Sequence, residues 1–152
     1  MAQDYFAPIL QAFGSSIGLE GLALDEHQSC TLAMGDVLLT MQWMPDADSL
    51  LVYAPVGMIT YGALDENLLV QLLEANCLGR GTGGLSLGLQ PGFGAVILSG
   101  SLFANRLAPV VLERFIEFFT GTAEEWIRRL AEAQGGREKI PDAPGMPAGL
   151  RV

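Results

Sequence analysis

The chain has 152 residues and a net charge of −9, with 50% of residues in the apolar set AVILMFWYC and 16% charged, against about 25% charged in a typical soluble domain. This length suits one domain, and the apolar excess predicts that it associates with itself or with a partner. All eight basic residues follow position 79, so the acidic field argues against nucleic acid and anionic membranes as partners and favours a neutral or basic protein.

The first predicted element is a helix over residues 4–17. Apolar side chains recur there at helical spacing, and Gly18 marks a stop. Three strands are predicted next, at Ser29–Met34, Val37–Met44 and Leu50–Val56, with turns between them. The second strand alternates a fully apolar face with a mixed face, which favours an antiparallel sheet that has helices on one side.

The next predicted helix begins after Asp65, whose carboxylate can accept hydrogen bonds from the free N–H groups of the first turn. Its polar residues form one narrow stripe, while apolar side chains cover nearly everything else; the stripe consists of Asn67, Gln71 and Glu74. A surface helix needs an apolar stripe only about 100° wide. We therefore expect one side of this helix to pack on its own domain and the other on a second copy of the chain.

A glycine-rich elbow at residues 79–84 follows this helix. A phosphate-binding loop needs a strand, a glycine turn and then a helix, whereas here a helix ends and a strand begins, so the glycines indicate a helix stop. Two strands are predicted at 85–90 and 95–101. The last helix is predicted over 107–133, and a capping-box pattern after Gly121 leaves open whether it breaks there.

These elements predict an α+β fold with a largely antiparallel sheet and the order α-β-β-β-α-β-β-α. We expect one domain over residues 1–134 and, because Gly and Pro dominate beyond it, a flexible tail over residues 135–152. The start lacks the basic region of a signal peptide, and the uncharged stretch 81–104 is too rich in Gly and Pro for a membrane span. A cytoplasmic protein without membrane insertion is therefore expected.

Catalytic chemistry finds little support in the sequence. His27 is the only histidine, which excludes a multi-histidine metal site. His27 and Cys30 form the one conceivable base and nucleophile pair, but at a strand entrance, three residues apart, their side chains would point to opposite faces. We expect no catalytic residue, no metal and no cofactor, with Cys30 and Cys77 as reduced thiols.

The most specific pattern lies in residues 72–89, where a helix with the spacing Leu-x-x-Asn-x-Leu leads through Gly-Gly into a short apolar strand. The matching positions are Leu73, Asn76, Leu78, Gly83, Gly84 and Leu87. This pattern resembles that of the class I type III secretion chaperones, the CesT/Tir-chaperone family. The resemblance extends over about residues 3–133 and includes the acidity, the order of elements and an aromatic-rich last helix.

The resemblance implies a homodimeric, non-enzymatic chaperone of the bacterial cytoplasm. Such a protein binds the N-terminal segment of a secreted effector in extended form, keeps it soluble and delivers it to the secretion apparatus, with the export ATPase as a further candidate partner. The implied dimer interface comprises Leu68, Leu69, Leu72, Leu73, Leu85 and Leu87. The implied effector contacts are Tyr5, Phe13, Leu32, Leu38 and Met44. The alternative that stays open is a dimeric α+β adaptor or binding module without an export substrate.

Overall fold

The computed structural model describes residues 2–62 and 65–138. Its helices and strands are α1 (Ala2–Ser16), β1 (Ser29–Met34), β2 (Val37–Met44), β3 (Ser49–Met58), α2 (Glu66–Asn76), β4 (Ser86–Leu89), β5 (Ala95–Phe103) and α3 (Pro109–Glu138). Three short 3-10 turns lie between them: η1 (Pro45–Ala47), η2 (Cys77–Gly79) and η3 (Ala104–Arg106). The predicted order of elements is confirmed, and β1 and β2 have the bounds expected from the sequence.

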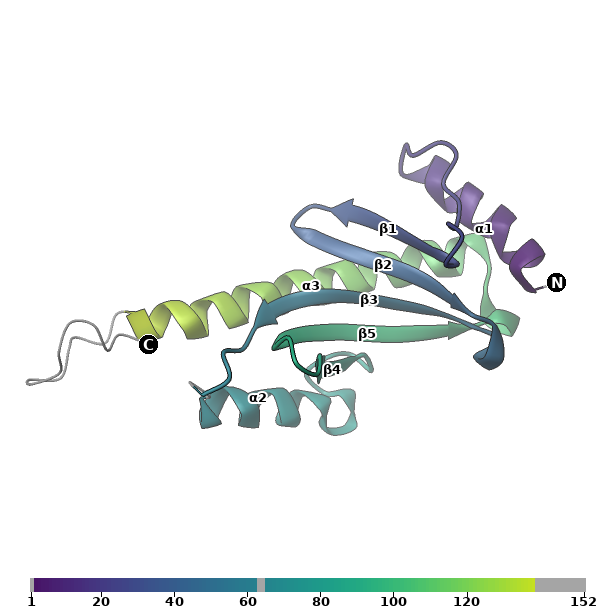
Figure 1. Ribbon diagram of the computed structural model, residues 1–152. Helices are drawn as coiled ribbons and strands as arrows, with labels where there is room; N and C mark the ends of the chain where they lie inside the picture. The colour runs from purple at the N-terminus through teal and green to yellow at the C-terminus, as the bar shows by residue number, and fades with distance from the viewer. Residues whose placement is uncertain (1, 63–64, 139–152) are drawn as a thin grey trace, which may run out of the picture.

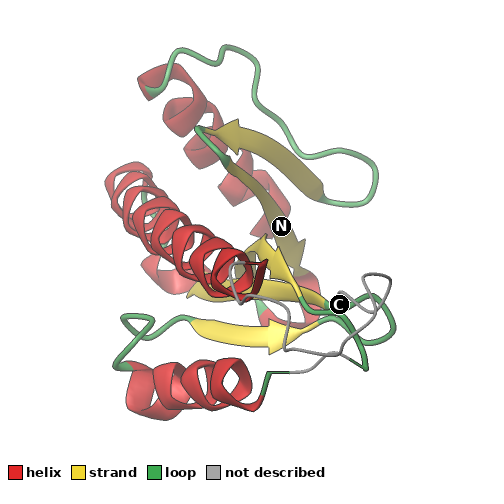
Figure 2. Ribbon diagram, turned by 90° about the vertical axis from the view of Figure 1, so that its left-hand side faces the viewer, coloured by secondary structure: helices red, strands yellow, loops and turns green. Residues whose placement is uncertain are grey.

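The five strands form one antiparallel sheet with the order β1-β2-β3-β5-β4. Helix α2 lies beside β4, at the far end of the molecule from α1 and β1 (Figure 1). Figure 2 shows the same separation from the side, with α3 running along the sheet between the two ends. The molecule therefore has two distinct ends, one made by α1 and β1 and the other by α2 and β4.

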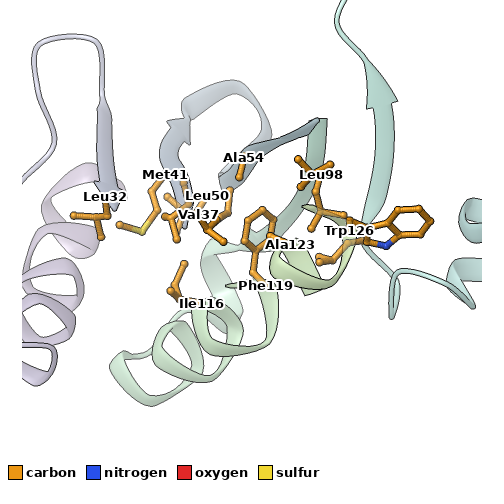
Figure 3. Close-up of a cluster of buried hydrophobic side chains, with 14 of the residues drawn as sticks. Leu32, Val37, Met41, Leu50, Ala54, Leu98, Ile116, Phe119, Ala123 and Trp126 are labelled. Atoms are coloured by element: carbon orange, nitrogen blue, oxygen red, sulfur yellow. The ribbon is translucent and has the colours of Figure 1, made fainter. Parts of the chain in front are cut away.

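One face of the sheet carries the apolar residues that bury the core. In β2 the side chains of Val37, Leu39, Met41 and Trp43 are buried, whereas Leu38 on the other face is exposed. Both α1 and α3 pack on the buried face. Their core residues join the strand residues in one cluster, and Phe6 of α1 stacks on Trp43 at 5.6 Å between ring centroids. Figure 3 shows this cluster; its labelled α3 members are Ile116, Phe119, Ala123 and Trp126.

Helix α3 is continuous through Gly121, so the helix does not break there. Thr122 does not act as an N-cap, because its Oγ1 donates to the carbonyl of Phe118 at 3.0 Å, within the helix. Glu125, which would complete a capping box, pairs instead with Arg128 and Arg129. The packing of buried residues on both sides of Gly121 thus overrides a local end signal.

Both ends of α3 differ from the expectation. The helix begins at Pro109, and the carbonyl of Ala108 accepts the first bonds from Val111 and Leu112. Leu107, where the sequence predicts the start of this helix, instead follows the 3-10 turn η3 in extended backbone. At the other end α3 runs to Glu138, so residues 135–138 are helical where the sequence predicts the start of a tail. The remainder of that predicted tail lies outside the described residues.

Candidate functional site

Helix α2 is fastened to the edge of the sheet by one side chain. The Nδ2 atom of Asn76 donates to the carbonyl of Leu87 at 2.7 Å, and the N–H of Leu87 donates to Oδ1 of Asn76 at 2.8 Å. The amide thereby makes the pair of bonds that a neighbouring strand would make with Leu87. At the other end of α2, Asp65 accepts from the N–H of Asn67 at 3.0 Å, which confirms the predicted cap.

The glycine elbow reverses the chain between α2 and β4. Leu78 and Gly79 have φ values of 56° and 66°, so the helix ends in left-handed backbone as predicted. Thr82 is buried, and its hydroxyl donates to the carbonyl of Leu85. Trp126 of α3 donates its indole N–H to the carbonyl of Gly81. The elbow is therefore packed between α2 and α3 and is not an open phosphate cradle.

The six predicted interface leucines fall into three groups. Leu68, Leu85 and Leu87 are buried in the chain's own core, and Leu69 and Leu72 are half-buried against it. Leu73 is 71% exposed. Of these six leucines, only Leu73 therefore offers most of its side chain to a second molecule.

Two further apolar residues near Leu73 lie outside the predicted set. Val70 on α2 is 51% exposed and Leu78 in the elbow is 84% exposed. The sequence does indicate that Val70 can contact a second molecule, because the apolar arc of α2 is wider than packing on one domain needs. The sequence pattern marks Leu78 as a motif position but does not indicate its exposure, which accompanies its left-handed backbone in the elbow.

The outer face of the sheet has a shallow hollow near α2. It measures about 370 Å³ and lies over β3, β5 and β4. Its floor includes the small residues Ser86, Gly88 and Ser99, with Tyr53 and Ile97 beside them. Small side chains leave room for the close approach of another element. This hollow and the exposed side of α2 belong to the same end of the molecule.

The five predicted effector contacts divide between surface and core. Leu38 is 55% exposed and Met44 is 36% exposed, both on the sheet face opposite α1 and α3. Tyr5 is half-exposed, and its hydroxyl donates to the carbonyl of Leu107 at 3.1 Å. Phe13 and Leu32, in contrast, are buried in the core and expose almost no surface.

The register of the sheet explains the burial of Leu32. It lies opposite Leu39 across the β1–β2 pair, and directly opposed residues share a face. Leu39 is fully buried, so Leu32 is turned inward with it.

The arrangement around His27 does not suit a thiol enzyme. His27 is exposed and lies near Glu26, while the carboxylate of Asp25 accepts the backbone N–H groups of His27 and Ser29 and organises the turn. Cys30 points into the core, and burial raises the pKa of its thiol, the opposite of what a nucleophile needs. Within residues 2–62 and 65–138, no three His, Cys, Asp or Glu side chains gather in a way that could hold a metal ion.

None of the described helices combines the length and the apolar composition that crossing a bilayer requires.

The family model of the Tir chaperone protein (CesT) family matches residues 8–127, which is most of the chain. The chain belongs to the CesT family. Members are chaperones, which are not a class of enzyme, and the match spans α1 to most of α3. No curated protein matches this CesT chain.

Solved structures with the same fold include several complexes. The ExsC–ExsE complex is 26% identical over 84% of this chain and 95% of that chain, with a TM-score of 0.72. The HopA1–SchA chaperone–effector complex is 21% identical over 82% and 91%, with a TM-score of 0.63. The ExoT–SpcS complex from Pseudomonas aeruginosa is 20% identical over 82% and 98%, with a TM-score of 0.60. The HopA1–SchA and ExoT–SpcS complexes are similar to this chain in fold alone.

Proposed function

We propose that this CesT chain is a type III secretion chaperone of the bacterial cytoplasm, which as a homodimer holds the N-terminal segment of a secreted effector extended and ready for export. The observation that carries the proposal is that exposed apolar side chains gather on two surfaces outside the core. These are the outer side of α2, at Val70 and Leu73, and the outer sheet face, at Leu38 and Met44. Holding and releasing an effector segment requires no catalytic residue.

The α2 end of the molecule supplies the proposed dimer contact. Leu73, Val70 and Leu78 of one subunit would pack at the hollow lined by Ser86 and Gly88 of the other, in a reciprocal two-fold arrangement. Burying each of these apolar side chains would contribute roughly 1.5–3 kcal/mol as an upper value. In this proposal the buried leucines of the predicted set, such as Leu85, support the interface from inside, and Leu73 makes direct contact.

The β1 end supplies the proposed effector site. Among the described residues, no backbone hydrogen bond from a turn or loop reaches the outer edge of β1 beyond Ser29, whereas the edge of β4 is hydrogen-bonded at Leu87 by Asn76. An extended segment can add as a strand to a free edge and lay alternate apolar side chains on nearby surface. Leu38 and Met44 would receive such side chains on the outer sheet face. A broad apolar contact is needed because the segment loses conformational entropy on binding.

Two measurements test the proposal. Size-exclusion chromatography with light scattering on the full chain is expected to give twice the monomer mass. Co-expression with candidate secreted proteins, beginning with the products of neighbouring genes, is expected to give a complex in which limited proteolysis leaves an N-terminal segment of the effector intact. A stable monomer would contradict the dimer, and a segment digested at the same rate with and without the chain would contradict the chaperone.

The same measurements separate the chaperone from a dimeric adaptor. An adaptor would give the dimer mass and bind a folded partner domain, and the N-terminal segment of that partner would remain open to protease.

A further inference from the structure

A surface groove lies on each of two sides of helix α3, and the side chains of the core fill neither of them. The first, here called the α1–α3 groove, measures about 470 Å³. Its accessible apolar lining consists of the half-buried Ile17 and Met34, and the buried Phe13 and Ile116 lie beneath them. The second, here called the elbow groove, measures about 410 Å³ and is lined by Gly83 and Phe118 among others. Phe118 is 44% exposed there.

The two grooves meet on α3. Both are lined by Glu117 and by Gly121, which lie one helical turn apart on the same side of the helix. At any other residue type a side chain would stand between the grooves. At Gly121 none does, and no heavy atom outside its own helix lies within 4 Å of the position that a Cβ would occupy. Gly121 therefore forms a low saddle that connects the grooves.

Glycine at position 121 makes the helix less stable, and nothing in its immediate surroundings requires it. A helix-interior Gly destabilises by about 0.5–1 kcal/mol relative to Ala. Gly57 and Gly100 are glycines because a Cβ would meet Leu130 or Leu85 closely, but Gly121 lies in open space and has helical backbone. The missing side chain therefore serves neither the packing nor the backbone of the described chain.

The charges of the α1–α3 groove indicate which kind of chain segment would bind there and cross α3 at Gly121. Glu113, Glu117 and Glu124 line it, and no basic side chain does. Among the described residues none of the three forms an ion pair, in contrast to Glu125, which is adjacent to Glu124 and pairs with Arg128 and Arg129. Like charges on one helix side repel one another unless a cation lies between them. An apolar floor below an uncompensated acidic rim is complementary to a segment that alternates apolar and basic residues.

We propose that the effector segment crosses α3 at Gly121, with apolar side chains in both grooves and Lys or Arg side chains against Glu113, Glu117 and Glu124. This inference rests on the proposed chaperone function and adds the path and the chemistry of the bound segment. A helix is about 10 Å across and an extended chain rises about 3.3 Å per residue, so three to four residues cross the saddle. About ten residues reach from one groove into the other.

The test uses the full chain and a fluorescein-labelled peptide of about twelve residues that alternates Lys with Leu, long enough to span both grooves. Fluorescence anisotropy gives its affinity. We expect the peptide to bind, and a matched peptide with Glu in place of each Lys to bind roughly tenfold more weakly or less. Gly121→Leu is expected to weaken the Lys peptide roughly tenfold by filling the saddle, without lowering the midpoint of urea unfolding.

Matched variants make the test specific. Gly135 is also on α3 with open space around it, so Gly135→Leu is expected to leave the affinity unchanged. The pair Glu117→Gln and Glu124→Gln is expected to weaken binding more than Asp46→Asn with Asp48→Asn, which removes the same charge at a distant turn.

Three results would overturn the inference: no binding of the Lys peptide, equal binding of the Glu peptide, or equal affinity of Gly121→Leu and the unchanged chain. These outcomes are distinct from a failure of the chaperone function. If the unchanged chain and Gly121→Leu both protect the co-expressed effector segment from protease equally, the chaperone stands and the crossing path is wrong.

Discussion

The indole Nε1 of Trp126 donates a hydrogen bond to the carbonyl of Gly81 at 3.1 Å, joining residues far apart in the sequence. Trp126 is buried, and Arg129 lies over its ring at 5.1 Å from the centroid. This contact attaches the last helix to the elbow between α2 and β4. The long helix thereby fixes the direction in which α2 leaves the sheet, and so the surface proposed for dimerisation.

The first prediction concerns the elbow. Gly83→Ala is expected to destabilise the fold by roughly 2–3 kcal/mol, because φ is +63° and the new Cβ would force the half-exposed ring of Phe118 to move. Gly18→Ala is the matched control, with φ of +78° and open space, and should cost only about 1–2 kcal/mol. Urea unfolding measures both. Equal losses would mean that the contact with Phe118 contributes nothing.

The second prediction concerns the edge of the sheet. Asn76→Ala removes both bonds to Leu87 and leaves its part-buried backbone groups unpaired, which should cost roughly 2–3 kcal/mol. Asn67→Ala removes an exposed amide from the same helix and should change the free energy of unfolding by about 0.5 kcal/mol or less. If the two variants unfold alike, the amide of Asn76 does not hold β4.

The third prediction concerns the dimer. Leu73→Asp should produce a folded monomer, because Leu73 is exposed in the single chain and a carboxylate cannot be buried unpaired in an interface. Light scattering gives the mass and circular dichroism the fold. Val110→Asp places the same charge at a 53% exposed residue of α3 and should leave the dimer intact. A dimer that survives Leu73→Asp would place the interface elsewhere.

The fourth prediction concerns the outer sheet face. Leu38→Asp should reduce retention of the co-expressed effector at least several-fold while the chain stays dimeric, because an apolar contact is replaced by a solvated charge. Met58→Asp is the control, since Met58 is equally exposed at 54% but lies at the end of β3. Quantified pull-down with the tagged chain measures how much effector each variant retains relative to the unchanged chain. Equal loss for both variants would argue for a non-specific effect of charge.

The fifth prediction concerns pH. Hydrogen bonds from Arg128 and Arg129 lower the pKa of Glu125 from 4.5 to about 2. A carboxylate with a lowered pKa stabilises the fold above its unfolded pKa, and this contribution fades as pH falls from about 4.5 to about 2. Urea unfolding should therefore show Glu125→Gln less stable than the unchanged chain at neutral pH, by a small amount that salt reduces, and equally stable near pH 2.

A double substitution controls that experiment. With Arg128→Ala and Arg129→Ala already present, Glu125→Gln should have no pH-dependent effect. A difference that persists in this background would assign the effect to another partner.

Much of the fold is predictable from residue spacing. The bounds of β1 and β2 follow from alternation and from the turn at Gly35, which has φ of +60°. The continuity of α3 at Gly121 does not follow, because buried residues such as Phe119 and Ala123 hold the helix on the sheet across a local end signal. Local rules carry no information about that packing.

The candidate site is predictable in outline and not in its details. The width of the apolar arc on α2 indicates a second contact surface, but which leucine remains exposed depends on where β4 lies. The resemblance assigns Phe13 and Leu32 to the effector, whereas strand register and helix packing turn both into the core. Asn76 stands out as a motif residue, yet its bonds to Leu87 require the elbow to bring β4 back alongside α2.

Hydrogen exchange of the complex with its effector tests the central claim most directly. If an extended effector segment adds to the sheet, the amides of β1 should exchange more slowly in the complex than in the chain without effector, together with those of a short N-terminal stretch of the effector. Bound effector with unchanged exchange across β1 would contradict the account.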